Sequence, residues 1–395
     1  MQLHVGQVRT NSISPNAKKK KKITSLLTHI THAYNIKIYA IRSLRTAPSF
    51  IRIGHLELFS RRTRQGDDMA QEHLRQLVKH AIAREFSDEI DVENTDFQDQ
   101  LLQFLRLYAK RAAKTSVEWL RVGYVQGNMN SDNCLISGRT MDYGPFGFME
   151  NYHPLWNPFT SDPERKFGFE RQVMAAQVNL GTLADALSVL FTKEETLDGA
   201  KKVVGQEYPQ ILTTYRSEMR KNKLGLNEWN ESLDESLWKP IYNVLIGLDY
   251  TIFFRQLSNS KINPQEMLNA SDDDLLKPVL PAIYDVDQLT NEKKVEITTW
   301  MRLWLLELSK QESTHKTTIE QRENAMKKAN PKYVPREWML KEAYDAAEKN
   351  GNYEFIYDLQ TIFNAPYDEH VEFETRYYKL TPNEMRRKAG VSFYS

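Results

Sequence analysis

The sequence predicts an α+β protein in which helix dominates, and three observations support this. Apolar residues recur at helical spacing over most of the chain after Asp68. One long segment, residues 124–169, interrupts that pattern and is rich in Gly, Asn, Pro and aromatic residues. The loose alternation of apolar and polar residues that is typical of a strand occurs at Phe50–Leu58.

The first helices are expected over residues 68–86 and 95–122. Six apolar residues of the second segment fall at helical spacing and should pack into the core: Phe97, Leu101, Leu105, Tyr108, Ala112 and Trp119. Gly123 should end that helix. After Glu170, helices are expected at residues 170–192, 195–222, 231–258, 287–312, 315–329, 336–350 and 353–363. A long irregular segment between helices is usually functional, so residues 124–169 are the place to look for polar chemistry.

Composition excludes several classes of protein. The 395 residues are 41% hydrophobic, which suits one large or two ordinary soluble domains. The 53 Lys and Arg nearly balance the 52 Asp and Glu, so a dedicated nucleic-acid binder is not expected. No apolar run approaches the roughly 18 residues of a membrane span. The one cysteine, Cys134, excludes an intramolecular disulfide framework and a multi-cysteine metal site, and the apolar residues after it favour a packed thiol.

Charge is distributed unevenly. Residues 1–56 contain ten Lys and Arg, with five in the run Lys18–Lys22, and no Asp or Glu. We expect residues 1–40 to form a poorly ordered basic leader. An acid-free basic start resembles an organelle transit peptide, which predicts a mitochondrial protein. A disordered basic arm, a misassigned start of the chain and a cytoplasmic location are the alternatives.

Polar residues that can bind metal and phosphate gather in the irregular segment. Asp132 and Asn133 are adjacent, and a short apolar run then meets a turn at Ser137–Gly138 before Asp142-Tyr143-Gly144. A hairpin here would return Asp142 towards Asn133. Asp-Tyr-Gly has the form of the Asp-Phe-Gly that holds magnesium in kinases, and carboxylate and amide oxygens are ligands that Mg²⁺ prefers. A polar hairpin without a metal remains the alternative.

One position differs from the kinase pattern. The kinase catalytic loop carries its base, an Asp, five residues before the metal-binding Asn. Asn128 stands there in this chain and cannot accept a proton from a hydroxyl group. Either the chain is inactive, or Asp132 acts as the base.

Several motifs together resemble the selenoprotein O family of protein adenylyltransferases, which have a pseudokinase fold. The similarity covers residues 44–390 in one order. The matching segments are Leu44–Gly54, Asn130–Asn133, Met141–Phe148, Lys223–Leu226, Asp249–Arg255, Asn330–Tyr333 with Arg336, and Pro366–Tyr367. The resemblance implies a kinase-like C-lobe with a helical C-terminal extension, spanning residues 41–395.

The resemblance also implies an activity and its residues. Members transfer AMP from ATP, with Mg²⁺, to Ser, Thr or Tyr hydroxyl groups of proteins. Asp132 matches the proton acceptor, Asn133 and Asp142 match the metal ligands, and Asp142 also belongs to the nucleotide site. Arg45 and Arg52 match two nucleotide-binding arginines. Protein substrates are the expected partners, without nucleic acid or membrane, and the oligomeric state stays open.

The chain departs from the family pattern at both ends. The family's glycine-containing phosphate loop and its ATP lysine precede the position of Arg45, but Gly6 is the one glycine before it, so most of the N-terminal lobe is expected to be missing. No cysteine pair precedes Ser395, so redox control through such a pair is unsupported. A transferase impaired by the missing lobe is therefore expected, with a non-catalytic scaffold or a phosphotransferase as alternatives.

Overall fold

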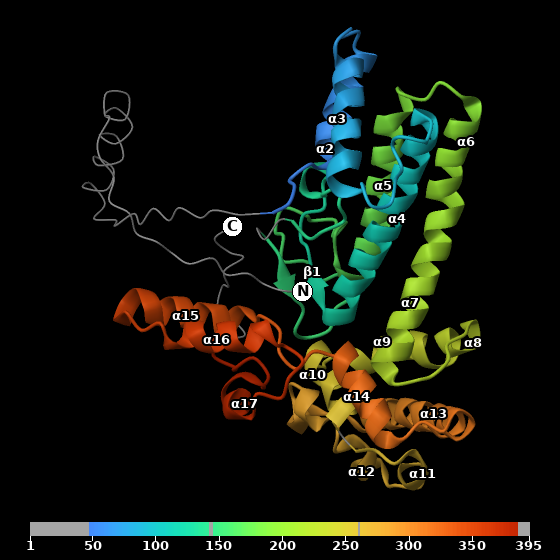
Figure 1. The fold of residues 1–395 in the computed structure, drawn as a ribbon. Helices are drawn as coiled ribbons and strands as arrows, with labels where there is room; N and C mark the ends of the chain where they lie inside the picture. Colours follow the sequence, from blue (N-terminus) through green and yellow to red (C-terminus); the bar gives the residue numbers. More distant parts are fainter. Residues whose placement is uncertain (1–46, 142–144, 260, 386–395) are drawn as a thin grey trace. The chain divides into compact units, whose positions relative to one another are not determined.

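A computed structural model describes residues 47–141, 145–259 and 261–385. The chain divides into two compact units, residues 1–48 and 49–395, and all elements given below belong to the second unit. The leader expected at residues 1–40 lies outside the described residues. Figure 1 shows the helices in the order in which the chain visits them.

Helices make up most of the described structure, so the α+β, mostly helical class is confirmed. The first half of the unit contains α2 (Ile53–Arg64), α3 (Ala70–Glu85), α4 (Phe97–Val122), α5 (Gln172–Ser188), α6 (Glu194–Lys202) and α7 (Tyr208–Leu224). The second half contains α8 (Glu231–Leu233), α9 (Lys239–Leu245), α10 (Tyr250–Asn259), α11 (Pro264–Met267), α12 (Asp272–Leu276), α13 (Asn291–His315), α14 (Ile319–Ala329), α15 (Glu337–Asn350), α16 (Glu354–Asn364) and α17 (Val371–Tyr377). One two-stranded antiparallel sheet, β1 (Tyr124–Val125) with β2 (Gly147–Phe148), is present in the described residues.

The strand predicted at Phe50–Leu58 is wrong, because the chain turns into helix α2 at Ile53. Ile53, Leu56 and Ser60 are buried, and their spacing is helical. The helix packs against α3 and α5, and this tertiary contact overrides the short alternation in the sequence. The extended backbone is limited to the residues just before the helix, where Arg52 makes an isolated antiparallel bridge with Leu135.

Helix α4 forms as predicted and leads directly into the irregular segment. Asp96 caps its first turn, since its carboxylate accepts a hydrogen bond from the Gln98 amide at 3.2 Å. Gly123 ends the helix in the left-handed conformation, with φ of 75°. Of the predicted stripe, Leu101, Leu105, Tyr108 and Ala112 are buried, while Phe97 and Trp119 are half-buried.

Two long predicted helices are interrupted. The segment 195–222 is helical but contains a π-helical turn at Val203–Glu207 between α6 and α7. The segment 231–258 contains a π-helical turn at Asp234–Trp238 and then breaks completely between α9 and α10. At the break Gly247 has φ of 85°, and the Asp249 carboxylate accepts a hydrogen bond from the Ile252 amide at 2.9 Å. The break therefore starts a new helix whose first turn is capped by a buried aspartate.

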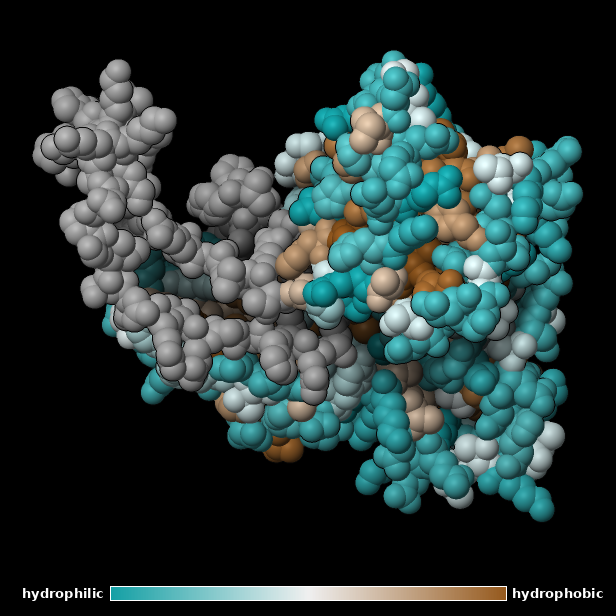
Figure 2. Space-filling view, turned by 45° about the horizontal axis from the view of Figure 1, so that its top comes forward, coloured by the Kyte–Doolittle hydropathy of each residue, from teal (hydrophilic) through white to brown (hydrophobic). Residues whose placement is uncertain are grey.

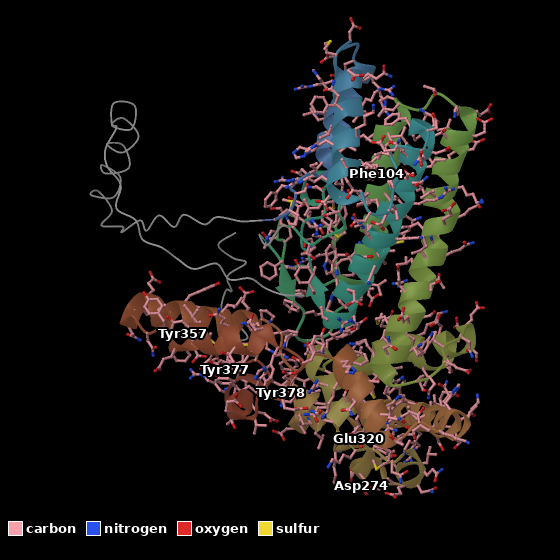
Figure 3. The ribbon with its side chains drawn as sticks, viewed as in Figure 1. Phe104, Asp274, Glu320, Tyr357, Tyr377 and Tyr378 are labelled. Carbon is pink, nitrogen blue, oxygen red and sulfur yellow. The ribbon has the colours of Figure 1, made fainter. Side chains whose placement is uncertain are left out.

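The unit has two hydrophobic cores. The first extends from Ile53 to Met326 and includes Phe104 of α4. The second is a small core within the C-terminal helices α15, α16 and α17, formed by Tyr333, Trp338, Met339, Ala343, Leu359, Ile362 and Tyr377. Figure 3 labels Phe104 in the first core and Tyr377 in the second. The C-terminal extension therefore packs around its own centre.

The surface is mostly polar. On the face drawn in Figure 2, hydrophilic residues cover most of the described part, and apolar residues lie in small patches between them. Within the described residues, none of the helices combines the length and the apolar character needed to cross a bilayer.

Candidate functional site

Two of the predicted site residues, Asp132 and Asn133, lie between β1 and β2, on residues 126–146, which we call the site loop. Tyr124 pairs with Phe148 across the two strands, and the Met149 amide donates to the Gly123 carbonyl oxygen at 2.7 Å. Further along, a Cβ atom on Gly127 would lie 2.3 Å from the Pro145 oxygen. The two ends of the loop are therefore held together at its base, and Gly127, with φ of 83°, permits their close approach.

The residues Ser131–Asn133 form a single 3₁₀ turn in this loop. The Asn133 amide closes the turn by donating to the Asn130 carbonyl oxygen at 2.8 Å. Asp132 is exposed, and its carboxylate has no hydrogen-bond partner among the described residues. A free, exposed carboxylate on a fixed turn can accept a proton from an incoming group.

Helix α2 fixes this turn from one side. The Ser131 hydroxyl donates a 2.6 Å hydrogen bond to the Glu57 carboxylate. A Cβ atom on Gly54 would lie 3.2 Å from both the Cα and the amide nitrogen of Asp132, so the helix backbone contacts the turn directly. Backbone hydrogen bonds from Ile53 to Cys134 and from Ile136 to Ile51, at 3.0 and 3.1 Å, extend the contact. The turn therefore has a rigid support.

Arg52 lies beside the turn. Its Nη1 donates to the Asp132 carbonyl oxygen at 2.9 Å, while its Nε is buried without a hydrogen-bond partner within the described residues. The geometry thus brings Arg52 and Asp132 together, as expected for a shared site. Because that Nε is buried, the half-buried guanidinium can bind a phosphate only through its Nη groups. Arg45, the other predicted arginine, lies outside the described residues.

Asn133 lies next to the returning arm of the site loop. Asn133 and Met141 both line a cavity of about 30 Å³, together with Tyr108, Trp119 and Cys134. That volume holds one or two water molecules. Asp142 follows Met141 but lies outside the described residues, so the convergence of Asn133 and Asp142 stays a prediction.

The arm that leads to Asp142 is attached to α4. The Thr115 hydroxyl donates to the Gly138 carbonyl oxygen at 2.6 Å, and the Trp119 Nε1 donates to the Thr140 hydroxyl at 2.9 Å. The turn itself lies one residue earlier than predicted, closed by a 3.0 Å bond from the Gly138 amide to the Leu135 oxygen. A ladder between the two arms is absent from the described residues, because Leu135 pairs with Arg52 instead.

Asn133 suits the predicted metal site. Its side chain is half-buried, and the side-chain amide makes no hydrogen bond to the described residues, so its oxygen is free to act as a ligand. A hard amide oxygen beside a carboxylate fits Mg²⁺. Within residues 47–141, 145–259 and 261–385, no three His, Cys, Asp or Glu side chains are grouped so that they could hold a metal ion.

Cys134 is a packed thiol, as predicted. Burial raises the pKa of its thiol to about 12, and the neighbouring Asp132 carboxylate acts in the same direction. The thiolate, which is the nucleophilic form, is therefore strongly disfavoured.

Glu57 is a site residue that the sequence reasoning missed. The strand predicted at Phe50–Leu58 contains Glu57 and indicates no contact between Glu57 and Ser131. In a helix, Gly54 and Glu57 are three residues apart and share one face, and this face contacts the turn. Recognition of the helical spacing of Ile53, Leu56 and Ser60 would have been the signal.

The chain is similar in sequence to proteins of one known family. Residues 40–364 match the family described as "Protein adenylyltransferase SelO". Three curated relatives carry the name "Protein nucleotidyltransferase YdiU". The relative from Rhodopirellula baltica is 32% identical over 89% of this chain, and the one from Flavobacterium johnsoniae is 31% identical over 99%. The relative from Azoarcus sp. is 34% identical over 89%.

The match covers most of this chain but less of each relative. The aligned part spans 64% of the Rhodopirellula protein, 70% of the Flavobacterium protein and 62% of the Azoarcus protein. The family match includes the site loop, the turn at Ser131–Asn133 and all of α2 to α15. On this similarity, the chain belongs to the SelO family of protein adenylyltransferases.

Proposed function

We propose that this chain transfers AMP from ATP to Ser, Thr or Tyr hydroxyl groups of proteins in a Mg²⁺-dependent reaction. The observation that carries the proposal is the turn at Ser131–Asn133, which presents the exposed Asp132 carboxylate beside the Arg52 guanidinium. Membership of the SelO family, and the name of the relatives, support the transfer of a nucleotide to protein. As part of the same proposal, the helices around the site loop form a kinase-like C-lobe with α15–α17 as its extension.

The proposed reaction uses the residues of the turn in separate roles. The acceptor hydroxyl oxygen attacks the α-phosphorus of ATP, and the bond from that phosphorus to the bridging oxygen of the β-phosphate breaks. Pyrophosphate leaves with the electron pair of that bond. The hydroxyl proton passes to the Asp132 carboxylate, which is free to receive it. Protein-bound AMP and pyrophosphate are the products.

The neighbours of Asp132 stabilise the negative charge on the phosphate oxygens. Arg52 is half-buried beside Asp132, and the Nη groups of its guanidinium can bind phosphate oxygens. Asn133 and Asp142 would hold Mg²⁺, which neutralises phosphate charge when bound. Arg45 is assigned to the same nucleotide. The residue that orients the proton acceptor is Glu57, through its bond to Ser131.

Labelled ATP tests the proposal. The chain is incubated with Mg²⁺, a protein acceptor and ATP labelled at either the α- or the γ-phosphate. Transfer of the α-label to protein is expected. Transfer of the γ-label would indicate a phosphotransferase, and labelling by neither would indicate a scaffold; both outcomes overturn the proposal.

A matched pair of variants tests the assigned roles. Asp132→Asn should abolish transfer and retain nucleotide binding, because the amide cannot accept the proton. Asp142→Ala should abolish metal-dependent nucleotide binding.

A location in mitochondria, indicated by the acid-free first 56 residues, belongs to the proposal. Imaging of a C-terminal fluorescent fusion tests it, and a cytoplasmic signal would contradict it.

A further inference from the structure

Three charged side chains meet in the interior away from the turn at Ser131–Asn133. Arg336 donates to both carboxylate oxygens of Asp249, at 2.5 and 2.9 Å, and its Nη1 also reaches Glu150 at 3.3 Å. The side chains of Arg336, Asp249 and Glu150 are 3%, 0% and 18% exposed. One buried arginine thus bridges two carboxylates.

The three residues come from segments that are distant in the sequence. Asp249 lies at the break between α9 and α10, and it also accepts a hydrogen bond from the Tyr284 hydroxyl at 3.2 Å. Arg336 directly precedes α15, the first helix of the C-terminal extension (Figure 1). Glu150 follows β2 by two residues. The cluster therefore joins the C-terminal extension to the residues that follow β2, the strand that closes the site loop.

Backbone contacts connect the cluster to the base of the site loop. The Glu150 carbonyl oxygen accepts a hydrogen bond from the Tyr250 amide at 2.9 Å. Asn151 forms an isolated antiparallel β-bridge with Asp249. One residue earlier, the Met149 amide donates a hydrogen bond to the carbonyl oxygen of Gly123, where α4 ends and β1 begins. Any movement of Glu150 is therefore transmitted to the two strands from which the site loop emerges.

We propose that Arg336 is a positioning residue for the transfer reaction: by holding Asp249 and Glu150 together it fixes the base of the loop that carries Asp132 and Asn133. The expected effect of Arg336 on turnover rests on the proposed function. Its effect on the position of the loop does not depend on that function. A geometric error of the order of 1 Å in a reacting group can reduce turnover by about a hundredfold.

Stability alone does not account for the cluster. Two carboxylates removed from water beside one cation incur a large desolvation cost, and such arrangements are often no more stable than apolar packing. Burial raises the pKa of Glu150 to about 6 even though Arg336 opposes that rise, and the Asp249 and Glu337 carboxylates add to it. The ionised Glu150 is thus less favourable in the folded protein than in water.

A second ionic cluster provides a matched control. Glu369 binds Arg255 at 2.8 Å and Lys332 at 2.9 Å, and both cations are buried. This cluster joins α10 to the same C-terminal helices, but within the described residues no hydrogen bond or ion pair links it to Glu150 or to the two strands. Loss of Glu369 should loosen the C-terminal extension and leave the base of the site loop in place.

Three variants separate positioning from stability: Arg336→Lys, Glu150→Gln and Glu369→Gln. For each, kcat, KM for ATP and the midpoint of thermal unfolding are measured, and hydrogen exchange of the amides at residues 147–152 is followed. We expect Arg336→Lys to reduce kcat by about tenfold or more with little change in KM, and to speed exchange at residues 147–152. Glu369→Gln should lower the unfolding midpoint and leave kcat within about twofold.

Glu150→Gln is the decisive variant, because Gln keeps the shape and removes the buried charge. We expect a higher unfolding midpoint together with a lower kcat and faster exchange at residues 147–152. A gain in stability with unchanged kcat and exchange would overturn the proposal. The proposal would also be overturned if, across all three variants, the loss of kcat were proportional to the fall in the unfolding midpoint. If the unaltered chain transfers no label, the proposed function fails, and the exchange rates alone decide whether Arg336 holds the loop.

Discussion

The pH dependence of folding stability gives a quantitative test of the buried Glu150 carboxyl group. Burial raises the pKa of Glu150 from its ordinary value of 4.5 to about 6. An increase of about 1.5 pKa units corresponds to about 2 kcal/mol of difference between the two protonation states. The folded protein therefore binds this proton more tightly than the unfolded chain does.

The sign of the effect follows from that difference in proton binding. Below pH 4.5 the carboxyl group is protonated in both states, and the free energy of unfolding carries no penalty from it. Stability then falls as the pH rises between 4.5 and 6, because the unfolded chain releases its proton first. About 0.8 kcal/mol of the penalty has developed at pH 5, and nearly all of the 2 kcal/mol at pH 8.

Glu150→Gln removes this titration. We expect the stability of the variant relative to the unaltered chain to grow by about 1 kcal/mol between pH 5 and pH 8, measured by urea unfolding. Other titrating groups, including the buried Glu170 with its raised pKa and His55 with its lowered pKa, occur in both proteins and cancel in the difference.

A control variant distinguishes burial from loss of charge in general. The Glu164 side chain is 72% exposed, so Glu164→Gln measures the effect of removing a carboxylate that folding leaves in water. The reasoning about Glu150 would be refuted by a flat difference for Glu150→Gln, or by one that shrinks as the pH rises.

Three further predictions concern the site loop. Gly54→Ala should reduce turnover by about tenfold with little loss of stability, because the new methyl group lies 3.2 Å from the Asp132 backbone while Ala favours the helix; normal kcat would show that the turn can yield. Gly127→Ala should lower the free energy of unfolding by at least about 2 kcal/mol, since its Cβ would lie 2.3 Å from the Pro145 oxygen at a positive φ, and chemical denaturation measures this. Cys134 should react with iodoacetamide far more slowly in the folded protein at pH 7.5 than after unfolding, because burial raises its pKa to about 12. Equal rates in the two states would contradict its burial.

Local patterns predicted the long elements because their signal is repeated many times. In α4 the apolar positions recur over seven turns, so the helix, its buried stripe and its end at Gly123 could all be predicted. Helix α2 has 12 residues, and at its first turns a strand-like alternation coincides with the helical spacing of Ile53 and Leu56. Packing against α3 and α5 decided between the two.

The segment that contains Asp132 and Asn133 could be located from residue types, but the turn at Ser131–Asn133 and its supports could not. Ser131 and Glu57 are 74 positions apart, and nothing in either local sequence indicates their hydrogen bond. The same holds for Arg336 and Asp249, which are 87 positions apart. The break that places Asp249 as a cap at the start of α10 could not be predicted either. A single glycine, Gly247, within an apolar helical pattern is a weak signal.

The sequence by itself determined the helical class, the irregular segment that contains Asp132 and Asn133, the packed state of Cys134 and the family. These depend on residue type, short-range periodicity and motif order, all of which are properties of the chain read in one dimension. Tertiary structure alone decided that α2 supports the turn, that Arg52 lies beside Asp132 and that Arg336 binds Glu150 just after β2. These contacts join residues far apart in the chain, and their geometry is set by the packing of whole helices.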